Sequence, residues 1–166
     1  MRSLFLNVDG IRTHYLEAGR GMEVVLFHSG EFGGCAELSW EFNLEALARH
    51  FHVIAPDWLG FGRTDKLHDF ENFPRRMLAH MRRFIEVKSV ERAAFIGNSM
   101  GGSYLARAMA SEAALFPARA IVLASGGGFT PFNEARKLLL DYDCSREGVK
   151  GMLHALFHSS KWAADE

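Results

Sequence analysis

Residues 97–102 read Gly97-Asn98-Ser99-Met100-Gly101-Gly102, and this stretch decides the predicted fold. It follows the apolar run at 93–96 and leads into a helical stretch that continues from Ser103. A Gly-x-Ser-x-Gly turn between a buried strand and a helix lifts the serine hydroxyl out of the turn as a nucleophile. The serine needs a strained backbone there, and small neighbours avoid collisions across the turn. We therefore predict Ser99 as a catalytic nucleophile, the alternative being a passive serine in a glycine-rich turn.

Strands and helices alternate along most of the chain. Apolar or alternating runs predict six strands, at residues 3–8, 11–17, 23–28, 51–55, 92–97 and 119–124, and helical spacing predicts helices at 37–49, 74–87 and 100–115. This alternation predicts an α/β fold, a mostly parallel sheet with helices on both faces. After residue 126 the pattern changes to two helices, at 132–142 and 146–158, so we predict a boundary near that point.

Two loops are expected to meet at the carboxyl edge of the parallel sheet. One carries Ser99, and the other is the small-residue loop at 28–34. The N–H group of Met100, at the start of a helix, is predicted to hold the oxyanion of a reacting carbonyl. The second oxyanion N–H is predicted to come from Gly30 or Glu31.

Side chains near these loops predict an apolar substrate site. Phe32 and Phe129 lie in loops, where aromatic rings line small-molecule pockets, although core packing is the alternative for each. Asn98 supports that pocket or stabilises its own turn. His28 is predicted to order its loop through hydrogen bonds, with a role as catalytic base as the alternative. Glu31 is predicted to be a solvated carboxylate, with a role as general acid as the alternative.

Composition excludes several kinds of partner. A net charge of −1 over 166 residues points to neither nucleic acid nor an anionic membrane, and no segment reaches the roughly 18 apolar residues that cross a bilayer. Dinucleotide and P-loop spacings are absent, and no metal or other cofactor is expected. His154 and His158 share a helix face, as a surface or packing pair or, alternatively, as metal ligands. Cys35 and Cys144 are predicted to be buried thiols in a reducing compartment, so a cytoplasmic protein is the default.

With these residues in place, the chain resembles the α/β-hydrolase superfamily. The matching features are the loop after His28, the Ser99 turn, and the segment Asp57-Trp58-Leu59-Gly60-Phe61-Gly62-Arg63-Thr64-Asp65. The form of residues 97–102 is similar to that of the meta-cleavage-product hydrolases. The resemblance implies an α/β-hydrolase fold, with residues 1–128 as the N-terminal part of the core and 129–166 as the beginning of a helical cap.

The resemblance also implies a reaction. Meta-cleavage-product hydrolases split a carbon–carbon bond in vinylogous 1,5-diketones made during aromatic degradation, so a small apolar carbonyl compound is the expected substrate. A carboxylesterase or lactonase is the alternative within the fold, and a non-catalytic relative that binds small molecules or a partner is the alternative outside enzymes. The chain departs from the group's His-Gly-x-Gly-Pro-Gly loop at Ser29, Glu31 and Phe32. Asp57 is predicted to tie down its own turn.

A serine nucleophile needs a base, and in this fold the order along the chain is serine, acid, histidine. The resemblance places the acid and the base after two later strands. The candidates downstream of Ser99 are Asp141, Asp143, His154 and His158, and they lie in the helical segment, where no triad is expected. The apolar strand at 120–123 would be internal in this fold. We therefore expect completion by a C-terminal segment or by a second chain, and a homo-oligomer stays open.

Overall fold

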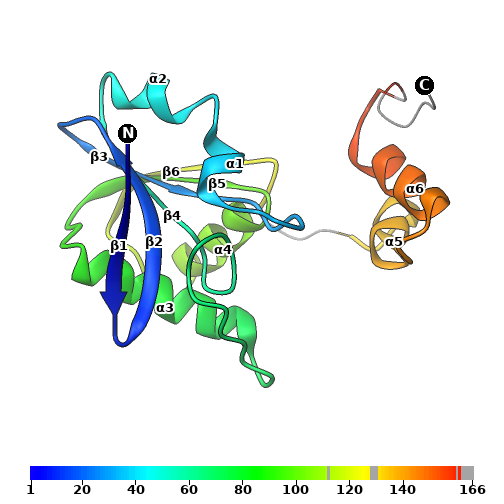
Figure 1. Ribbon diagram of the computed structural model, residues 1–166, viewed down its shortest axis with the longest axis horizontal. Helices are drawn as coiled ribbons and strands as arrows, with labels where there is room; N and C mark the ends of the chain where they lie inside the picture. Colours follow the sequence, from blue (N-terminus) through cyan, green and yellow to red (C-terminus); the bar gives the residue numbers. More distant parts are fainter. Residues whose placement is uncertain (112, 128–130, 160, 162–166) are drawn as a thin grey trace. The chain divides into compact units, whose positions relative to one another are not determined.

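The computed structural model describes residues 1–111, 113–127, 131–159 and 161, and the chain divides into two compact units, Met1–Gly128 and Phe129–Glu166 (Figure 1). The first unit contains a six-stranded sheet with the order β1-β2-β4-β3-β5-β6. Its strands are β1 (Arg2–Val8), β2 (Ile11–Ala18), β3 (Glu23–Phe27), β4 (His52–Pro56), β5 (Ala93–Asn98) and β6 (Ala118–Ala124). The β1/β2 and β2/β4 pairs are antiparallel, and the β3/β4, β3/β5 and β5/β6 pairs are parallel, so the predicted sheet is confirmed.

Helices cover both faces of this sheet, as predicted (Figure 1). These helices are α1 (Ala36–Trp40), α2 (Leu44–Ala48), α3 (Phe73–Val87) and α4 (Met100–Met109). Successive side chains of a strand point to opposite faces, and β3 feeds two apolar clusters in this way. Val25 and Phe27 pack in one cluster with residues of α3 and α4, whereas Val24 and Leu26 pack in the other with α1 and α2.

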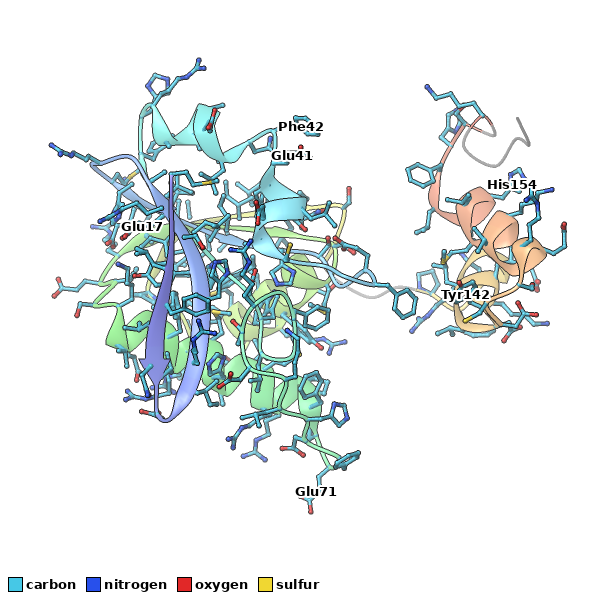
Figure 2. The ribbon with its side chains drawn as sticks, viewed as in Figure 1. Glu17, Glu41, Phe42, Glu71, Tyr142 and His154 are labelled. Atoms are coloured by element: carbon cyan, nitrogen blue, oxygen red, sulfur yellow. The ribbon has the colours of Figure 1, made fainter. Side chains whose placement is uncertain are left out.

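The single helix predicted at 37–49 is wrong, because the structure has two short helices there. The prediction placed Phe42 on the buried stripe, but its side chain is 86% exposed and points away from the sheet (Figure 2). Trp40 and Leu44 are the buried residues. The Asn43 N–H donates to the Trp40 carbonyl oxygen at 3.0 Å in the turn that separates the helices.

The helix predicted at 100–115 ends early, at Met109. The Ser111 hydroxyl lies 2.8 Å from the carbonyl oxygen of Ala108 and 2.7 Å from that of Ala113. A serine that bonds nearby backbone groups competes with the helical pattern. This local competition explains the early end of the helix.

The predicted burial of both cysteines is wrong. Cys35 is half-buried, and its Sγ accepts the Leu38 N–H as the cap of α1. Cys144 is exposed, with a φ of 65°. Both thiols are free.

The second unit contains, among its described residues, α5 (Glu134–Leu140) and α6 (Arg146–Leu156), which confirms the two predicted helices. Asn133 caps α5 by accepting the Arg136 N–H, and Ser145 caps α6 by accepting the Gly148 N–H, both at 2.9 Å. The two helices pack on each other, yet no described residue of either helix is buried. Apolar side chains therefore stay exposed on this unit, among them Leu138, Leu139, Leu140 and Leu156.

Candidate active site

Ser99 occupies the turn between β5 and α4, and its backbone is strained. Its φ of 50° and ψ of −113° lie outside the regions that residues with side chains prefer. The Ser99 N–H donates to the carbonyl oxygen of Ala124 at 2.9 Å, and the Ser103 N–H donates to that of Ser99 at 3.0 Å. The sheet and the helix thus hold the turn from two sides. Ser99 is exposed, so this strand–turn–helix geometry presents its hydroxyl to solvent.

Close backbone approaches explain the glycines around Ser99. A Cβ on Gly97 would lie 2.6 Å from the backbone of Gly101, and a Cβ on Gly101 would lie 2.4 Å from the carbonyl oxygen of Phe27. The sequence reading did not single out Gly126, where a Cβ would lie 2.1 Å from the carbonyl oxygen of Ser99. The run of three glycines at 126–128 was the available signal.

The loop after β3 lies against the start of α4. A Cβ on Gly30 would fall 2.6 Å from the Sδ atom of Met100, so the structure brings these two predicted residues together. Met100 is the first residue of α4, where N–H groups lack intrahelical acceptors and the helix dipole favours an anion. In the described part of the chain, no backbone–backbone hydrogen bond engages the N–H of Gly30 or of Glu31. The geometry can hold an oxyanion, and the assignment of these N–H groups stays a prediction.

His28 orders the loop, as predicted, rather than facing Ser99 as a base. It is fully buried, and its Nδ1–H donates to the carbonyl oxygen of Ser29 at 2.6 Å. The Trp58 N–H donates to Nε2 of the same ring at 3.0 Å. Burial lowers the pKa of His28, which favours the neutral ring that this bonding pattern requires. Both ring nitrogens are therefore engaged in fixing the loop to the turn after β4.

Asp57 ties down the turn after β4, which confirms its predicted structural role. Its Oδ2 accepts the Arg63 N–H and its Oδ1 accepts the Ala36 N–H, both at 2.8 Å. A Cβ on Gly62, which has a φ of 50°, would lie 2.0 Å from Oδ2. This buried carboxylate therefore joins the turn to the start of α1, directly after the loop at 28–34.

The structure places the predicted pocket residues unevenly. Phe32 is 88% exposed, and it lines a hollow of about 400 Å³ together with Gly30, Glu31, Gly33, Gly34, Gly60, Phe61, Gly62 and Lys66. Asn98 is half-buried at the end of β5. Phe129 lies outside the described residues. The roles of all three in binding substrate stay predictions.

The downstream acids and histidines belong to the second unit. Asp143 accepts the Ser145 N–H at 2.9 Å in the turn before α6, and its hydrogen bonds to Ser145 lower the pKa of the Asp143 carboxyl. Within the described residues, no three His, Cys, Asp or Glu side chains are grouped so that they could hold a metal ion.

Comparison with known proteins identifies the family. A family model described as alpha/beta hydrolase fold matches residues 23–150. The chain belongs to the α/β-hydrolase family. This confirms the fold class and the superfamily that the Ser99 turn and its companion loops predicted.

Several relatives within this family carry informative names. A 2-hydroxy-6-oxo-6-(2'-aminophenyl)hexa-2,4-dienoic acid hydrolase of Metapseudomonas resinovorans is 36% identical over 153 residues, which are 92% of this chain and 52% of that protein. The solved structure of a serine hydrolase involved in carbazole degradation is 35% identical, with a TM-score of 0.73 over 93% of this chain and 56% of that one. A meta-cleavage product hydrolase, at 24% identity and a TM-score of 0.80 over 97% and 59%, shows the shared fold.

The predicted resemblance to meta-cleavage-product hydrolases is thus confirmed for this α/β-hydrolase chain. The chain spans about half the length of these relatives. Among the described helices, none combines the length and apolar character needed to span a bilayer.

Proposed function

We propose that this chain carries the nucleophile part of a serine-dependent hydrolase that splits a carbon–carbon bond in a meta-cleavage product of aromatic degradation. The observation that carries the proposal is the strained turn at Ser99, with the loop of Gly30 packed against Met100 beside it. The names of the relatives at 36% and 35% identity support the substrate class. An apolar carbonyl compound is the corresponding substrate.

Each residue at the turn has a role in this proposal. Ser99 acts as the nucleophile or as the hydroxyl that orients attack on the carbonyl carbon. The N–H of Met100 and one N–H from Gly30 or Glu31 hold the oxyanion, and losing one such donor typically costs about 10²–10³ in rate. Asn98, Phe32 and Phe129 complete our proposed substrate pocket.

The acid and the base that activate Ser99 come, in this proposal, from a C-terminal segment or a second chain that also covers β6. The support is an exposed apolar edge. β6 lies at the end of the sheet, and Ile121, Val122 and Leu123 are 42%, 51% and 39% exposed. An uncovered apolar edge strand is an aggregation hazard. Residues 129–166 would then begin a helical cap, and the two free cysteines support a cytoplasmic location.

Replacing Ser99 with alanine tests the proposal, in the chain together with the C-terminal segment or second chain that supplies the acid and the base. Turnover of a dienone diketone should fall by at least about 10³-fold, because the nucleophile is lost. Ser89→Ala, at an exposed serine after α3, is the matched control and should keep full activity. Unchanged turnover in Ser99→Ala would refute the nucleophile role.

A second substrate, assayed with the same C-terminal segment or second chain present, separates the alternatives. Faster turnover of a p-nitrophenyl ester than of the diketone by the unmodified protein would favour the carboxylesterase or lactonase. Ligand binding without turnover, together with no reaction of Ser99 with a fluorophosphonate probe, would favour a non-catalytic binding protein.

A further inference from the structure

A second serine of the first unit is bonded to a histidine–carboxylate pair. The Oγ atom of Ser3 lies 2.8 Å from Nε2 of His14, and Nδ1 of His14 lies 2.7 Å from Oδ2 of Asp57. In the β1/β2 hairpin, Phe5 is paired with His14, and Ser3 lies two residues away on the same face. His14 and Asp57 are each 1% exposed, whereas Ser3 is exposed. A relay of hydrogen bonds therefore runs from a surface hydroxyl to a buried carboxylate.

The bonding pattern fixes the tautomer of the His14 ring. A carboxylate only accepts hydrogen bonds, so Nδ1 of His14 carries the proton that is donated to Asp57. In the neutral ring Nε2 is then the acceptor, and the hydroxyl of Ser3 is its donor. A serine whose proton points at the free nitrogen of a histidine that a carboxylate orients is activated for nucleophilic attack.

A cation lies beside the Ser3 oxygen. The Nη1–H of Arg63 donates to Oγ of Ser3, and its Nη2–H donates to Oε2 of Glu37, both at 3.2 Å. The ion pair with Glu37 orients the guanidinium of Arg63. The positive charge of the guanidinium stabilises negative charge that develops on the Ser3 oxygen or on an atom next to it.

Two hollows adjoin the relay. They share Gly33, Cys35 and Glu37 in their walls. The smaller, of about 230 Å³, is also lined by His14, Asp57, Gly62 and Arg63. The larger, of about 530 Å³, is also lined by Met1, Leu16, Leu38, Trp40, Glu41, Leu44 and Glu45. Ser3 is the hairpin partner of Leu16, a residue in the wall of the larger hollow, and it is bonded to His14, a residue in the wall of the smaller one.

The lining of the larger hollow selects a class of ligand. Leu16, Trp40 and Leu44 offer buried apolar surface, which suits an apolar group. Glu41 and Glu45 add carboxylates to Glu37. Neutral or cationic apolar molecules fit this lining, and anions are disfavoured by its charge.

We propose that Ser3 is a second nucleophilic serine, which takes acyl groups from small neutral or cationic esters. Its Oγ bonds to the ester carbonyl carbon while its proton passes to Nε2 of His14, and Arg63 stabilises the oxyanion. The bond from that carbon to the alcohol oxygen breaks, and the alcohol leaves with the proton from Nε2. Water then gives a proton to Nε2 and bonds to the acyl carbon. The carboxylic acid leaves, and the Ser3 oxygen recovers the proton.

Labelling of Ser3 in the Ser99→Ala protein tests this proposal without interference from the Ser99 turn. The probes are a fluorophosphonate and p-nitrophenyl acetate, and the adducts are located by mass on tryptic peptides 3–12 and 89–92, which contain Ser3 and the exposed reference Ser89. General-base catalysis predicts that Ser3 reacts about 10²-fold faster than Ser89 or more. Equal rates at the two serines overturn the proposal.

Two variants separate a catalytic relay from a structural one. His14→Gln should bring the rate at Ser3 down to that at Ser89. Because His14 is buried, a second variant, Arg63→Gln, changes an exposed side chain and should slow labelling of Ser3 at least about tenfold. An anionic ester, p-nitrophenyl hemisuccinate, should acylate Ser3 more slowly than the acetate. Full labelling of Ser3 in a folded variant of either kind overturns the proposal.

Discussion

The first unit contains two serine sites, and each has a different part of the machinery of a serine hydrolase. Ser99 has the strained turn, the helix N-terminus and the glycine loop that suit an oxyanion. Ser3 has the histidine and the carboxylate that suit proton transfer, at 2.8 and 2.7 Å, but it lies in an ordinary antiparallel strand. At Ser3 a single exposed arginine takes the place of the backbone N–H groups.

The difference shows what each kind of site requires from the fold. A nucleophile turn forms from local sequence, because residues 97–102 supply the strained residue and its small neighbours. A proton relay depends on tertiary structure, because it needs residues from different strands in register. Asp57 belongs to both sites, since it joins the turn after β4 to the start of α1, next to the loop at 28–34, and also orients His14.

Asp57→Ala should have the largest effect, on both sites together. The substitution removes the acceptor of three N–H groups: the backbone N–H of Ala36, the backbone N–H of Arg63 and the ring Nδ1–H of His14. Ala36 and His14 are buried. Removing one partner of such a buried network typically costs about 3–5 kcal/mol. Urea unfolding measures the free energy of unfolding, and the reactions of Ser99 and Ser3 should fall together.

Asp69→Ala is the matched control for Asp57. The Asp69 carboxylate also accepts two backbone N–H groups, from Glu71 and Asn72, but in an exposed turn. Its removal should cost much less stability than removal of Asp57, because water can bond to the freed N–H groups in an exposed turn. Equal losses in the two variants would contradict the role of Asp57 as the buried link between the sites.

His80 should give both sites a shared dependence on pH. It is 4% exposed, and burial together with Arg76 lowers its pKa to about 4, against about 6.5 in an unfolded chain. Between these values the unfolded chain binds more protons, so stability is complete above pH 6.5 and falls as the pH drops toward 4. The loss is about 3 kcal/mol at most. Urea unfolding at pH 7 and at pH 5 measures the part of this loss that falls between those two values, about 2 kcal/mol.

The variant His80→Gln should remove this part of the pH dependence, while His50→Gln, at an exposed ring, should retain it. If His80→Gln keeps the full loss of stability between pH 7 and pH 5, the assignment to His80 is wrong. The result also decides how acid profiles are interpreted. A fall in both serine reactions that disappears in His80→Gln reports a loss of stability and not a change in the chemistry of either site.

Local patterns were enough to predict most of the fold and the Ser99 turn. The unbroken apolar run of β3 predicts a strand covered on both faces, and Val24 and Val25 do pack in separate clusters. The roles of His28 and Asp57 followed from their positions at strand ends. The predicted helix at 37–49 was wrong because tertiary packing buries Trp40 in the core and leaves Phe42 exposed.

The Ser3 relay was beyond sequence reasoning for a physical reason. Ser3 and His14 are 11 positions apart, and His14 and Asp57 are 43 apart. Only the register of β1 with β2, and the pairing of Tyr15 with Pro56 between β2 and β4, brings them together. The two-residue turn Asp9-Gly10 fixes the register of β1 with β2, but no local rule predicts the pairing of β2 with β4.

Gly101→Ala should separate the two sites by the smallest change, one methyl group. The new Cβ would lie 2.4 Å from the carbonyl oxygen of Phe27 and 2.7 Å from that of His28, so the start of α4 must move away from the end of β3 and the loop that follows it. Such overpacking typically costs about 1–3 kcal/mol of stability, and a misplacement of about 1 Å at the reacting groups costs about 10²-fold in rate.

Gly151→Ala in α6, where the new Cβ would have its nearest contact at 3.4 Å, is the control. Gly101→Ala should slow the reaction of Ser99 and leave labelling of Ser3 unchanged, because β1 and β2 are not neighbours of β5 in the sheet. Equal slowing at both serines would mean that the two sites are not independent.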